Sequence, residues 1–83
     1  MQIEIFTGPS CSYCDSAKML LDKNRIEYNE RNVGDPEIFA ELQARLPRVK
    51  SIPQIFIEGD HVGGFEDLKL LLESIVYKDN LTQ

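Results

Sequence analysis

The sequence has no tryptophan, a single histidine and only two cysteines among its 83 residues. A secreted mini-protein of this size usually carries four or more cysteines, so a structural disulfide framework is not expected. A structural zinc site usually needs four ligands, and His61 cannot complete such a set with one cysteine pair. Nine cationic residues stand against 14 acidic ones, and this net charge of -5 argues against nucleic acid as the main partner.

Long apolar runs are also missing. No stretch approaches the roughly 20 apolar residues that span a bilayer, so we expect no membrane partner. The start "MQIEIFTG" has neither a basic leader nor a long apolar segment, which favours a cytoplasmic location. The length suits one domain over residues 1–83, and we expect it to work as a monomer.

Apolar periodicity and turn residues divide the chain into alternating strands and helices. The first half is predicted to hold a strand over residues 2–7, a helix from about Ser12 to Asn24, a polar edge strand from Ile26, and a helix capped by Asp35 and closed by Pro47. The second half is predicted to hold a strand over residues 54–58, a tight turn at Gly59-Asp60 and a strand over residues 61–64. A last helix follows, with an apolar stripe of Leu68, Leu71, Leu72, Ile75 and Val76. This order predicts an α/β fold, β-α-β-α-β-β-α, with a four-stranded mixed sheet flanked by helices.

The stretch "PSCSYCDSAK" places Cys11 and Cys14 where the first strand gives way to the first helix. A metal site, a structural cross-link and redox chemistry are the three interpretations of such a pair. In a reducing compartment, a lone Cys-x-x-Cys beside a βαβ pattern indicates a redox pair. Inert buried thiols are the structural alternative, and the position at a helix start disfavours them.

Three motifs together resemble a glutaredoxin, within the thioredoxin-like fold. They are Cys11-Ser12-Tyr13-Cys14, Ser51-Ile52-Pro53-Gln54 and Gly63-Gly64-Phe65-Glu66-Asp67. The resemblance runs from Ile3 to about Val76, and thioredoxin itself is a poorer match because this chain has no tryptophan beside the first cysteine. The resemblance implies glutathione-dependent thiol–disulfide exchange. Glutathione would be the reductant, and disulfide-containing or glutathionylated proteins would be the substrates, with ribonucleotide reductase as a candidate client.

In the mechanism that the resemblance implies, Cys11 is the nucleophile and Cys14 the resolving thiol. Two residues three apart on a helical turn have Cα atoms about 5 to 6 Å apart, a separation that a disulfide tolerates. We expect Cys14 to be buried and Cys11 to lie at the helix tip. The helix dipole lowers a thiol pKa by about one unit, and backbone N–H groups near Tyr13 and Cys14 would have to lower it further. Many glutaredoxins have a lysine where this chain has Gly8, so the lowering at Cys11 should be smaller.

The resemblance also implies a glutathione site. It assigns to glutathione the residues Tyr13, Arg48, Lys50, Ile52, Pro53, Gly64, Phe65, Glu66 and Asp67. A cis Ile52-Pro53 bond would turn the Ile52 backbone toward the peptide, with an ordinary trans proline as the alternative. Phe65 and Glu66 would offer N–H groups to the γ-glutamyl carboxylate. Tyr13 would form an aromatic wall beside the glutathione sulfur, and a place in the core is its alternative.

The charged residues of this region have more than one interpretation. Asp67 would accept from the γ-glutamyl amine, or would simply stabilise the first turn of its helix. Arg48 or Lys50 would meet the glycyl carboxylate, and the sequence does not choose between them. Arg45 is expected to be solvated, and His61 to be a surface residue of the hairpin.

A second function class stays open. Some glutaredoxins with Ser between Cys and Tyr hold a bridging 2Fe–2S cluster in a dimer, through thiolates equivalent to Cys11 and two glutathiones. No other metal site is expected. A third class, a redox-inactive binding module on the same scaffold, is disfavoured by the intact cysteine pair.

Overall fold

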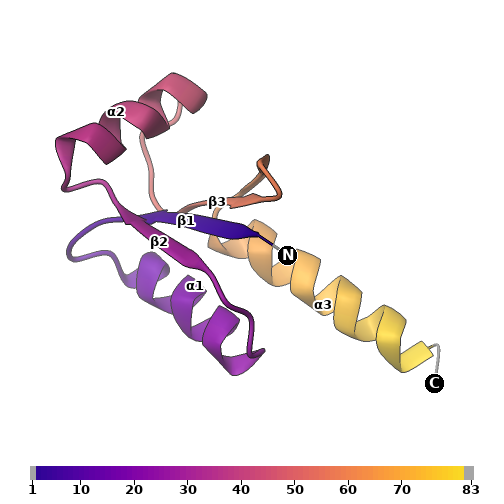
Figure 1. Cartoon of the computed structure of the whole chain (residues 1–83). Coiled ribbons are helices and arrows are strands. Elements are labelled where there is room, and N and C mark those ends of the chain that lie inside the picture. Colours follow the sequence, from indigo (N-terminus) through magenta and orange to yellow (C-terminus); the bar gives the residue numbers. More distant parts are fainter. Residues whose placement is uncertain (1, 82–83) are drawn as a thin grey trace.

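The computed structural model describes residues 2–81, with side chains over residues 2–74. In chain order, the elements are β1 (Ile3–Thr7), α1 (Ser12–Lys23), β2 (Asn29–Asn32), α2 (Pro36–Arg45), β3 (Gln54–Ile57), β4 (Asp60–Gly63) and α3 (Phe65–Leu81) (Figure 1). This is the order that the sequence predicts. None of the helices in the described part of the chain is long and apolar enough to cross a lipid bilayer.

The strands form one mixed sheet in the order β2-β1-β3-β4. β1 pairs with β2 in parallel and with β3 antiparallel, and β3 pairs antiparallel with β4. The polar β2 therefore lies at an edge, as its composition predicts, and the apolar β3 lies inside the sheet. Gln54, Ile55 and Phe56 of β3 are all buried, because helices cover both faces of this strand.

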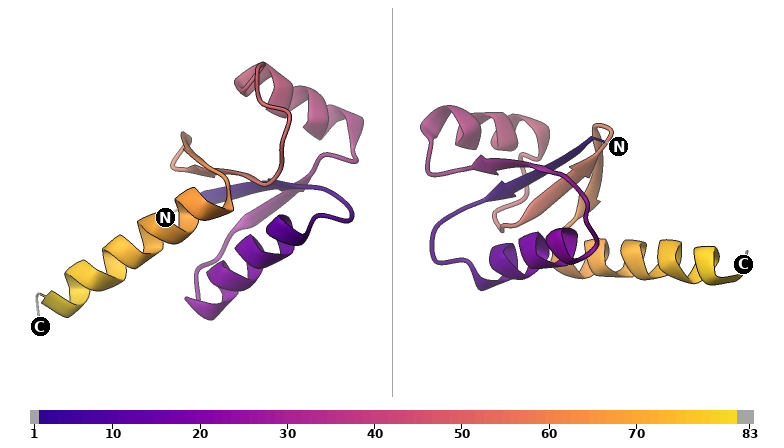
Figure 2. Two further views of the ribbon diagram at one scale, coloured as in Figure 1. Left: turned by 180° about the vertical axis from the view of Figure 1, so that it is seen from behind. Right: turned by 60° about the horizontal axis from the view of Figure 1, so that its bottom comes forward.

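The helices lie in two layers, with α1 and α3 on one face of the sheet and α2 on the other (Figures 1 and 2). Successive side chains of a strand point to opposite faces of the sheet, so β1 contributes apolar side chains to the packing on both faces. Its Ile3 and Ile5 join the larger apolar cluster, which also holds Ala17, Leu21, Ile55, Leu68 and Leu72. Phe6 joins the smaller cluster, beneath α2, with Leu42 and Phe56.

The apolar stripe expected on the last helix is only partly a core surface. Leu68 and Leu72 are buried, whereas Leu71 is 36% exposed. Leu70, which the stripe does not include, is 64% exposed. The side chains of Ile75 and Val76 lie outside the described residues.

The helix ends follow the local signals in the sequence. The Asn24 side chain donates to the Leu20 carbonyl at 2.8 Å and closes α1, as expected. Asp35 caps α2, because its carboxylate accepts the Glu37 N–H at 2.9 Å, and Pro36 occupies the first helical position. Both helices therefore begin and end where short-range chemistry predicts.

The hairpin turn lies one residue earlier than the sequence suggests. Glu58 and Gly59 have positive φ angles of 52° and 84°, and Ile57 pairs with Asp60 across the turn. The centre is thus Glu58-Gly59 and not Gly59-Asp60, because a two-residue turn of this hand needs positive φ at both positions. His61 lies opposite Phe56 in the same register, and an irregularity beyond this pair places Gly63 opposite Ile55.

Arg45 is exposed, as the sequence analysis expects, but its guanidinium also has protein partners. Its guanidinium donates to Glu4 at 2.9 Å and lies over the rings of Phe6 and Phe56, 5.4 and 5.0 Å from their centroids. Arg31 also bonds Glu4, at 3.0 Å. The sequence does not predict these contacts, because Arg45 and Arg31 are 41 and 27 residues away from Glu4 and only the fold brings them together.

Candidate active site

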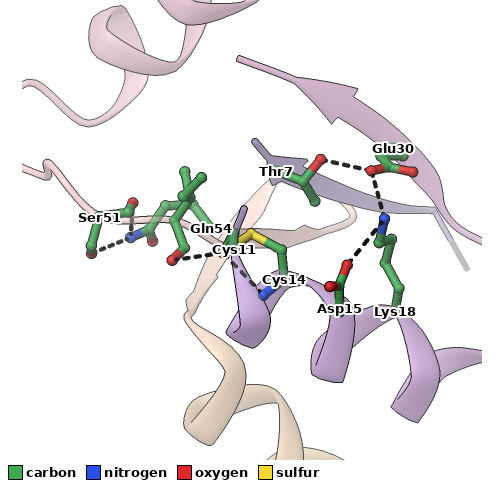
Figure 3. The surroundings of a disulfide bond; sticks show 9 residues. Thr7, Cys11, Cys14, Asp15, Lys18, Glu30, Ser51 and Gln54 are labelled. Carbon is green, nitrogen blue, oxygen red and sulfur yellow. Dashed lines mark hydrogen bonds and ion pairs between the residues drawn. A yellow bond between two sulfur atoms is a disulfide. The ribbon is translucent and has the colours of Figure 1, made fainter. Parts of the chain in front are cut away.

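The cysteine pair lies at the start of α1, after a turn in which Ser10 has a φ of 54°. A disulfide joins Cys11 to Cys14, with the Cα atoms 5.2 Å apart. Cys14 is 1% exposed, whereas Cys11 is only partly buried. The two sulfurs therefore differ in access to solvent in the way that the sequence analysis expects (Figure 3).

Cys11 is also the N-cap residue of α1. Its Sγ accepts the backbone N–H of Cys14 at 3.1 Å, one of the two donors expected there. The first N–H groups of a helix have no partner inside the helix, and they favour negative charge. A thiolate on Cys11 would occupy the same position and accept a stronger bond from this donor.

The Ile52-Pro53 peptide bond is cis, and it lies beside the cysteine pair. The carbonyl oxygen of Ile52 is 3.7 Å from the Sγ of Cys11. In the disulfide this sulfur has no hydrogen, whereas the Cys11 thiol can donate to the same carbonyl. Pro53 itself is buried, so the loop before β3 forms a wall of the site.

The same loop leaves no room for a side chain at Gly8. A Cβ on Gly8 would lie 2.6 Å from the Cδ1 of Ile52 and 3.4 Å from the Cγ2 of Val33. The Ile52 side chain therefore fills the space in which a side chain at position 8 would begin. The lysine that many glutaredoxins carry there would require Ile52 to move.

A groove of about 650 Å³ runs along this loop and the start of α3. Every residue that the resemblance assigns to glutathione lines it, namely Tyr13, Arg48, Lys50, Ile52, Pro53, Gly64, Phe65, Glu66 and Asp67. The tertiary structure thus brings segments around residues 13, 50 and 65 to one surface. Further lining residues, not assigned from the sequence, are Val49, Ser51, Gln54, His61 and Gly63.

Tyr13 is not a core residue, because it is 61% exposed. Its ring lies 6.1 Å from the ring of Phe65, measured between centroids. This pair joins the cysteine motif of α1 to the start of α3 and forms an aromatic end of the groove.

Asp67 stabilises the start of α3. Its Oδ2 accepts the backbone N–H of Gly64 at 3.0 Å, so the alternative that the sequence analysis left open is present in the structure. Gly63 has a φ of +127°, and a Cβ there would collide with the same carboxylate. A Cβ on Gly64 would only reach ordinary contact, 3.5 Å from the Pro53 carbonyl. Gly63 is therefore the glycine that this turn requires.

A chain of hydrogen-bonded side chains lies along the groove, and the sequence does not predict it. His61 bonds Gln54 at 2.7 Å, and the Gln54 amide bonds the Ser51 carbonyl at 3.0 Å. His61 does lie on the hairpin surface, as expected, but it also lines the groove. The only sequence signal for this chain was an amide residue next to the motif proline.

A second polar cluster lies on the other side of the disulfide (Figure 3). The buried Thr7 hydroxyl donates to Glu30 at 2.7 Å, and Lys18 donates to the same carboxylate oxygen at 3.0 Å. These two bonds hold the pKa of Glu30 below its usual range, the Thr7 bond being the larger cause. The bond to Glu30 likewise raises the pKa of Lys18. The cluster ties β1, α1 and β2 together behind the cysteines.

The fold and the site define a class of protein. A Cys-x-x-Cys disulfide at a helix N-terminus, beside a cis-proline loop on a four-stranded mixed sheet, is the arrangement of thioredoxin-like thiol–disulfide oxidoreductases.

Comparison with known proteins identifies the family. The glutaredoxin family model matches residues 3–62. The chain is 46% identical over 68 residues to a glutaredoxin of Neisseria meningitidis serogroup A, a match that covers 80% of this chain and 79% of the relative. It is 33% identical over 69 residues to glutaredoxin 3 of Escherichia coli, and 83% of each chain is covered. The chain therefore belongs to the glutaredoxin family, the glutathione-dependent disulfide oxidoreductases.

Solved structures agree on the fold. Glutaredoxin 1 of Francisella tularensis, complexed with cacodylate, has a TM-score of 0.76 at 28% identity and covers 92% of this chain, with 96% of its own chain matched. A buckwheat glutaredoxin–glutathione complex has a TM-score of 0.73 at 24% identity, covering 87% of this chain and 68% of its own. At that identity the likeness is one of fold.

Proposed function

We propose that Cys11 is the attacking thiol and Cys14 the resolving thiol in the reduction of protein disulfides and glutathione mixed disulfides. The observation that carries this assignment is the asymmetry of the pair. Cys11 is partly accessible and accepts a helix N–H, whereas Cys14 is 1% exposed and lies within bonding distance of the Cys11 sulfur. An attacking thiol needs access and a stabilised thiolate, and a resolving thiol needs only proximity.

With a glutathionylated substrate, the Cys11 thiolate attacks the glutathione sulfur. A Cys11–glutathione disulfide forms, and the substrate leaves as a thiolate that takes a proton from water. A second glutathione thiolate then attacks this disulfide, which releases oxidised glutathione and restores the Cys11 thiolate. In the net reaction one glutathione thiol is oxidised, the substrate sulfur is reduced to a thiol, and the two glutathione sulfurs leave as one disulfide.

With a protein disulfide, the Cys11 thiolate attacks one substrate sulfur and forms a mixed disulfide with it. The substrate S–S bond breaks, and the other substrate sulfur leaves as a thiolate that takes a proton from water. Cys14 then loses its proton and attacks the Cys11 sulfur, so the second substrate thiol leaves. The product on the enzyme is the Cys11–Cys14 disulfide that the structure contains. Two glutathiones return it to the dithiol and leave as oxidised glutathione.

The groove beside Cys11 is proposed as the glutathione site. The Ile52 backbone next to the cis bond would pair with the cysteinyl backbone of the peptide. The N–H groups of Phe65 and Glu66 open α3 and suit the γ-glutamyl carboxylate. Arg48 or Lys50 would bind the glycyl carboxylate, and Tyr13 would flank the sulfur.

Asp67 can serve both of the roles considered for it. Its Oδ2 accepts the Gly64 N–H, and its second oxygen would accept from the γ-glutamyl amine. The lining of the groove supports this proposal, because Gly63, Gly64 and Asp67 all border the same space.

Four broader proposals accompany this one. The chain would act in the cytoplasm, as a monomer, and as one domain over residues 1–83. Its substrates would be disulfide-containing or glutathionylated proteins, with ribonucleotide reductase as the candidate client.

The test compares Cys14→Ser and Cys11→Ser on two substrates, a glutathione mixed disulfide of a small thiol and a protein with one exposed disulfide. Cys14→Ser should keep the first activity and lose the second by about 100-fold or more, because only the second needs a resolving thiol. Cys11→Ser should lose both. Circular dichroism of each variant provides the folding control, and equal loss of both activities in Cys14→Ser would overturn the assignment.

The glutathione-ligated 2Fe–2S dimer is carried as the alternative. The described residues contain no group of three or more His, Cys, Asp or Glu side chains placed to hold a metal. A cluster would therefore have to combine Cys11 of two chains with two glutathiones, in keeping with the thiolate preference of iron–sulfur clusters. Purification under anaerobic conditions with glutathione present decides between the two, as argued below.

A further inference from the structure

The loop that carries the cis-proline is tied to the neighbouring hairpin by side chains. The Gln54 Nε2 donates to the Ser51 carbonyl at 3.0 Å and lies 3.3 Å from the Ser51 Oγ (Figure 3). The Gln54 Oε1 lies 2.7 Å from the Nε2 of His61 on β4. A continuous chain thus runs from His61 through Gln54 to Ser51, one residue before Ile52.

The direction of each bond follows from its neighbour. A carboxamide has two N–H donors on nitrogen and only acceptor capacity on oxygen. Because a backbone carbonyl can only accept, the Gln54 nitrogen must face Ser51 and the Gln54 oxygen must face His61. His61 therefore carries a hydrogen on Nε2, and its Nδ1 is left for solvent or a ligand.

Because Gln54 is buried, losing a hydrogen bond of this chain would be costly. Gln54 is only 6% exposed, so an unpaired amide oxygen there would lose its water and gain nothing in return. The His61 ring is held in place by packing on Phe56, with 5.1 Å between ring centroids. The imidazole thus reaches Gln54 from a fixed position, set by the hairpin register that places His61 opposite Phe56.

We propose that His61, acting through Gln54, is a positioning residue that holds the Ser51–Pro53 segment in the shape needed to bind glutathione. This inference rests on the proposed function, because it takes the groove beside Cys11 as the glutathione site. His61 has no contact with either cysteine among the interactions of the described residues. It therefore governs how tightly the peptide docks and not how fast the sulfurs exchange.

Because of that geometry, loss of the His61 hydrogen bond should lower the affinity for glutathione and leave the turnover rate unchanged. The Ile52 backbone, which would pair with the peptide, is adjacent to the carbonyl that Gln54 holds. Loosening this carbonyl lets the loop sample other shapes, and binding then has to restore the right one. The Cys11 sulfur keeps its own donor, the Cys14 N–H, so the chemistry is unaffected.

The first test uses His61→Phe, which keeps a ring against Phe56 but removes the Nε2 donor. The probe is S-methylglutathione, which cannot undergo exchange, and its Kd is measured by calorimetry. Loss of one hydrogen bond to a buried amide should raise this Kd by about 2- to 10-fold. Turnover at saturating glutathione mixed disulfide should stay close to that of the wild type.

His61→Gln is the rescue variant, because its Nε2 stands the same number of bonds from Cα as the imidazole Nε2. It should restore most of the affinity. Asp60→Asn, an exposed neighbour outside the groove lining, is the matched control and should leave the Kd unchanged. In amide NMR spectra of the free protein, His61→Phe should shift the Ser51 and Ile52 signals, and His61→Gln should shift them less.

A double-mutant cycle adds Gln54→Met, which keeps the volume of the side chain but not its hydrogen bonds. If the two residues act through one chain, the double variant should bind little worse than the weaker single variant. Additive effects, an unchanged Kd in His61→Phe, or a failed rescue would each overturn the positioning role while wild-type binding persists. If S-methylglutathione did not bind the wild-type groove at all, the proposed glutathione site would fall, and this inference with it.

Discussion

The neighbouring glycines Gly63 and Gly64 differ in backbone conformation and in the space available for a side chain. Gly63 has a φ of +127°, a conformation that L side chains rarely adopt, and a Cβ there would strike the Asp67 carboxylate. Gly64 has space for a Cβ, with the nearest atom 3.5 Å away. The sequence presents the two glycines as one flexible pair, and only their backbone angles separate them. Gly63 makes it possible for Asp67 to cap α3.

We predict that Gly63→Ala destabilises the protein by about 1 to 3 kcal/mol, because it combines an unfavourable φ with a collision. The free energy of unfolding, measured in urea, provides the readout. Gly64→Ala is the matched control and should be neutral or stabilise by up to about 1 kcal/mol, because alanine reduces the entropy of the unfolded chain. Equal destabilisation by the two variants would contradict this account.

Charged contacts help to hold α2 on the sheet. Of its residues, only Leu42 is fully buried. Its end is fastened by Arg45, whose guanidinium bonds Glu4 of β1 and covers Phe6 and Phe56. Chiefly because of the hydrogen bond from Arg45, the pKa of Glu4 is lowered from 4.5. An element with a thin apolar face is thus attached partly through a carboxylate that must stay ionised.

This attachment predicts an acid-sensitive contribution to stability. Because the Glu4 pKa is lower in the folded state, the unfolded state binds more protons below about pH 4.5, and stability falls as the pH falls through the folded pKa. Glu4→Gln should cost on the order of 1 kcal/mol at pH 7, and the difference from the wild type should shrink in acid. Urea unfolding at pH 7, 5 and 3 measures the cost of Glu4→Gln at neutral pH and its decrease in acid. These pH values bracket the range in which carboxyl groups titrate.

Glu37→Gln, an exposed change in the first turn of the same helix, is the control for the loss of one carboxylate. Its difference in stability from the wild type should change little between the same pH values, because Glu4 is intact in both proteins. A Glu4→Gln deficit that stayed constant from neutral to acid pH would mean that ionisation of Glu4 does not stabilise α2.

At the scale of the whole molecule, the groove is assembled from segments that are distant in sequence. Tyr13 comes from α1, the Arg48–Pro53 loop lies between α2 and β3, and Phe65 opens α3. The central strands β1 and β3 set these segments side by side, because the pairing of Phe6 with Gln54 brings the loop next to the end of β1. All of these lining segments come from one chain.

We therefore predict a colourless monomer when the protein is purified anaerobically with glutathione. Sedimentation should give a single species of one chain, and the absorbance spectrum should lack visible charge-transfer bands. Cys11→Ser is the control, because it removes the thiolate that a bridging cluster would need. Visible bands together with a dimer, both lost in Cys11→Ser, would replace this prediction with the 2Fe–2S alternative.

Local chemistry alone determined a large part of this protein. Asp35, Pro36 and Asn24 act within four residues of themselves, so the helix ends could be predicted from the sequence. The position of Cys11 and Cys14 at a helix start followed from the same short-range patterns. Resemblance to a known family supplied the residues of the groove, including the cis bond at Ile52-Pro53.

Tertiary structure decided what depends on the register between strands. The turn at Glu58-Gly59 and the strand register that it sets place His61 opposite Phe56 and within reach of Gln54. The packing of α2 on the sheet likewise brings Arg45 to Glu4 across 41 positions of sequence. Such contacts follow from which strands are neighbours and by how many residues they are offset, and no local propensity encodes that information.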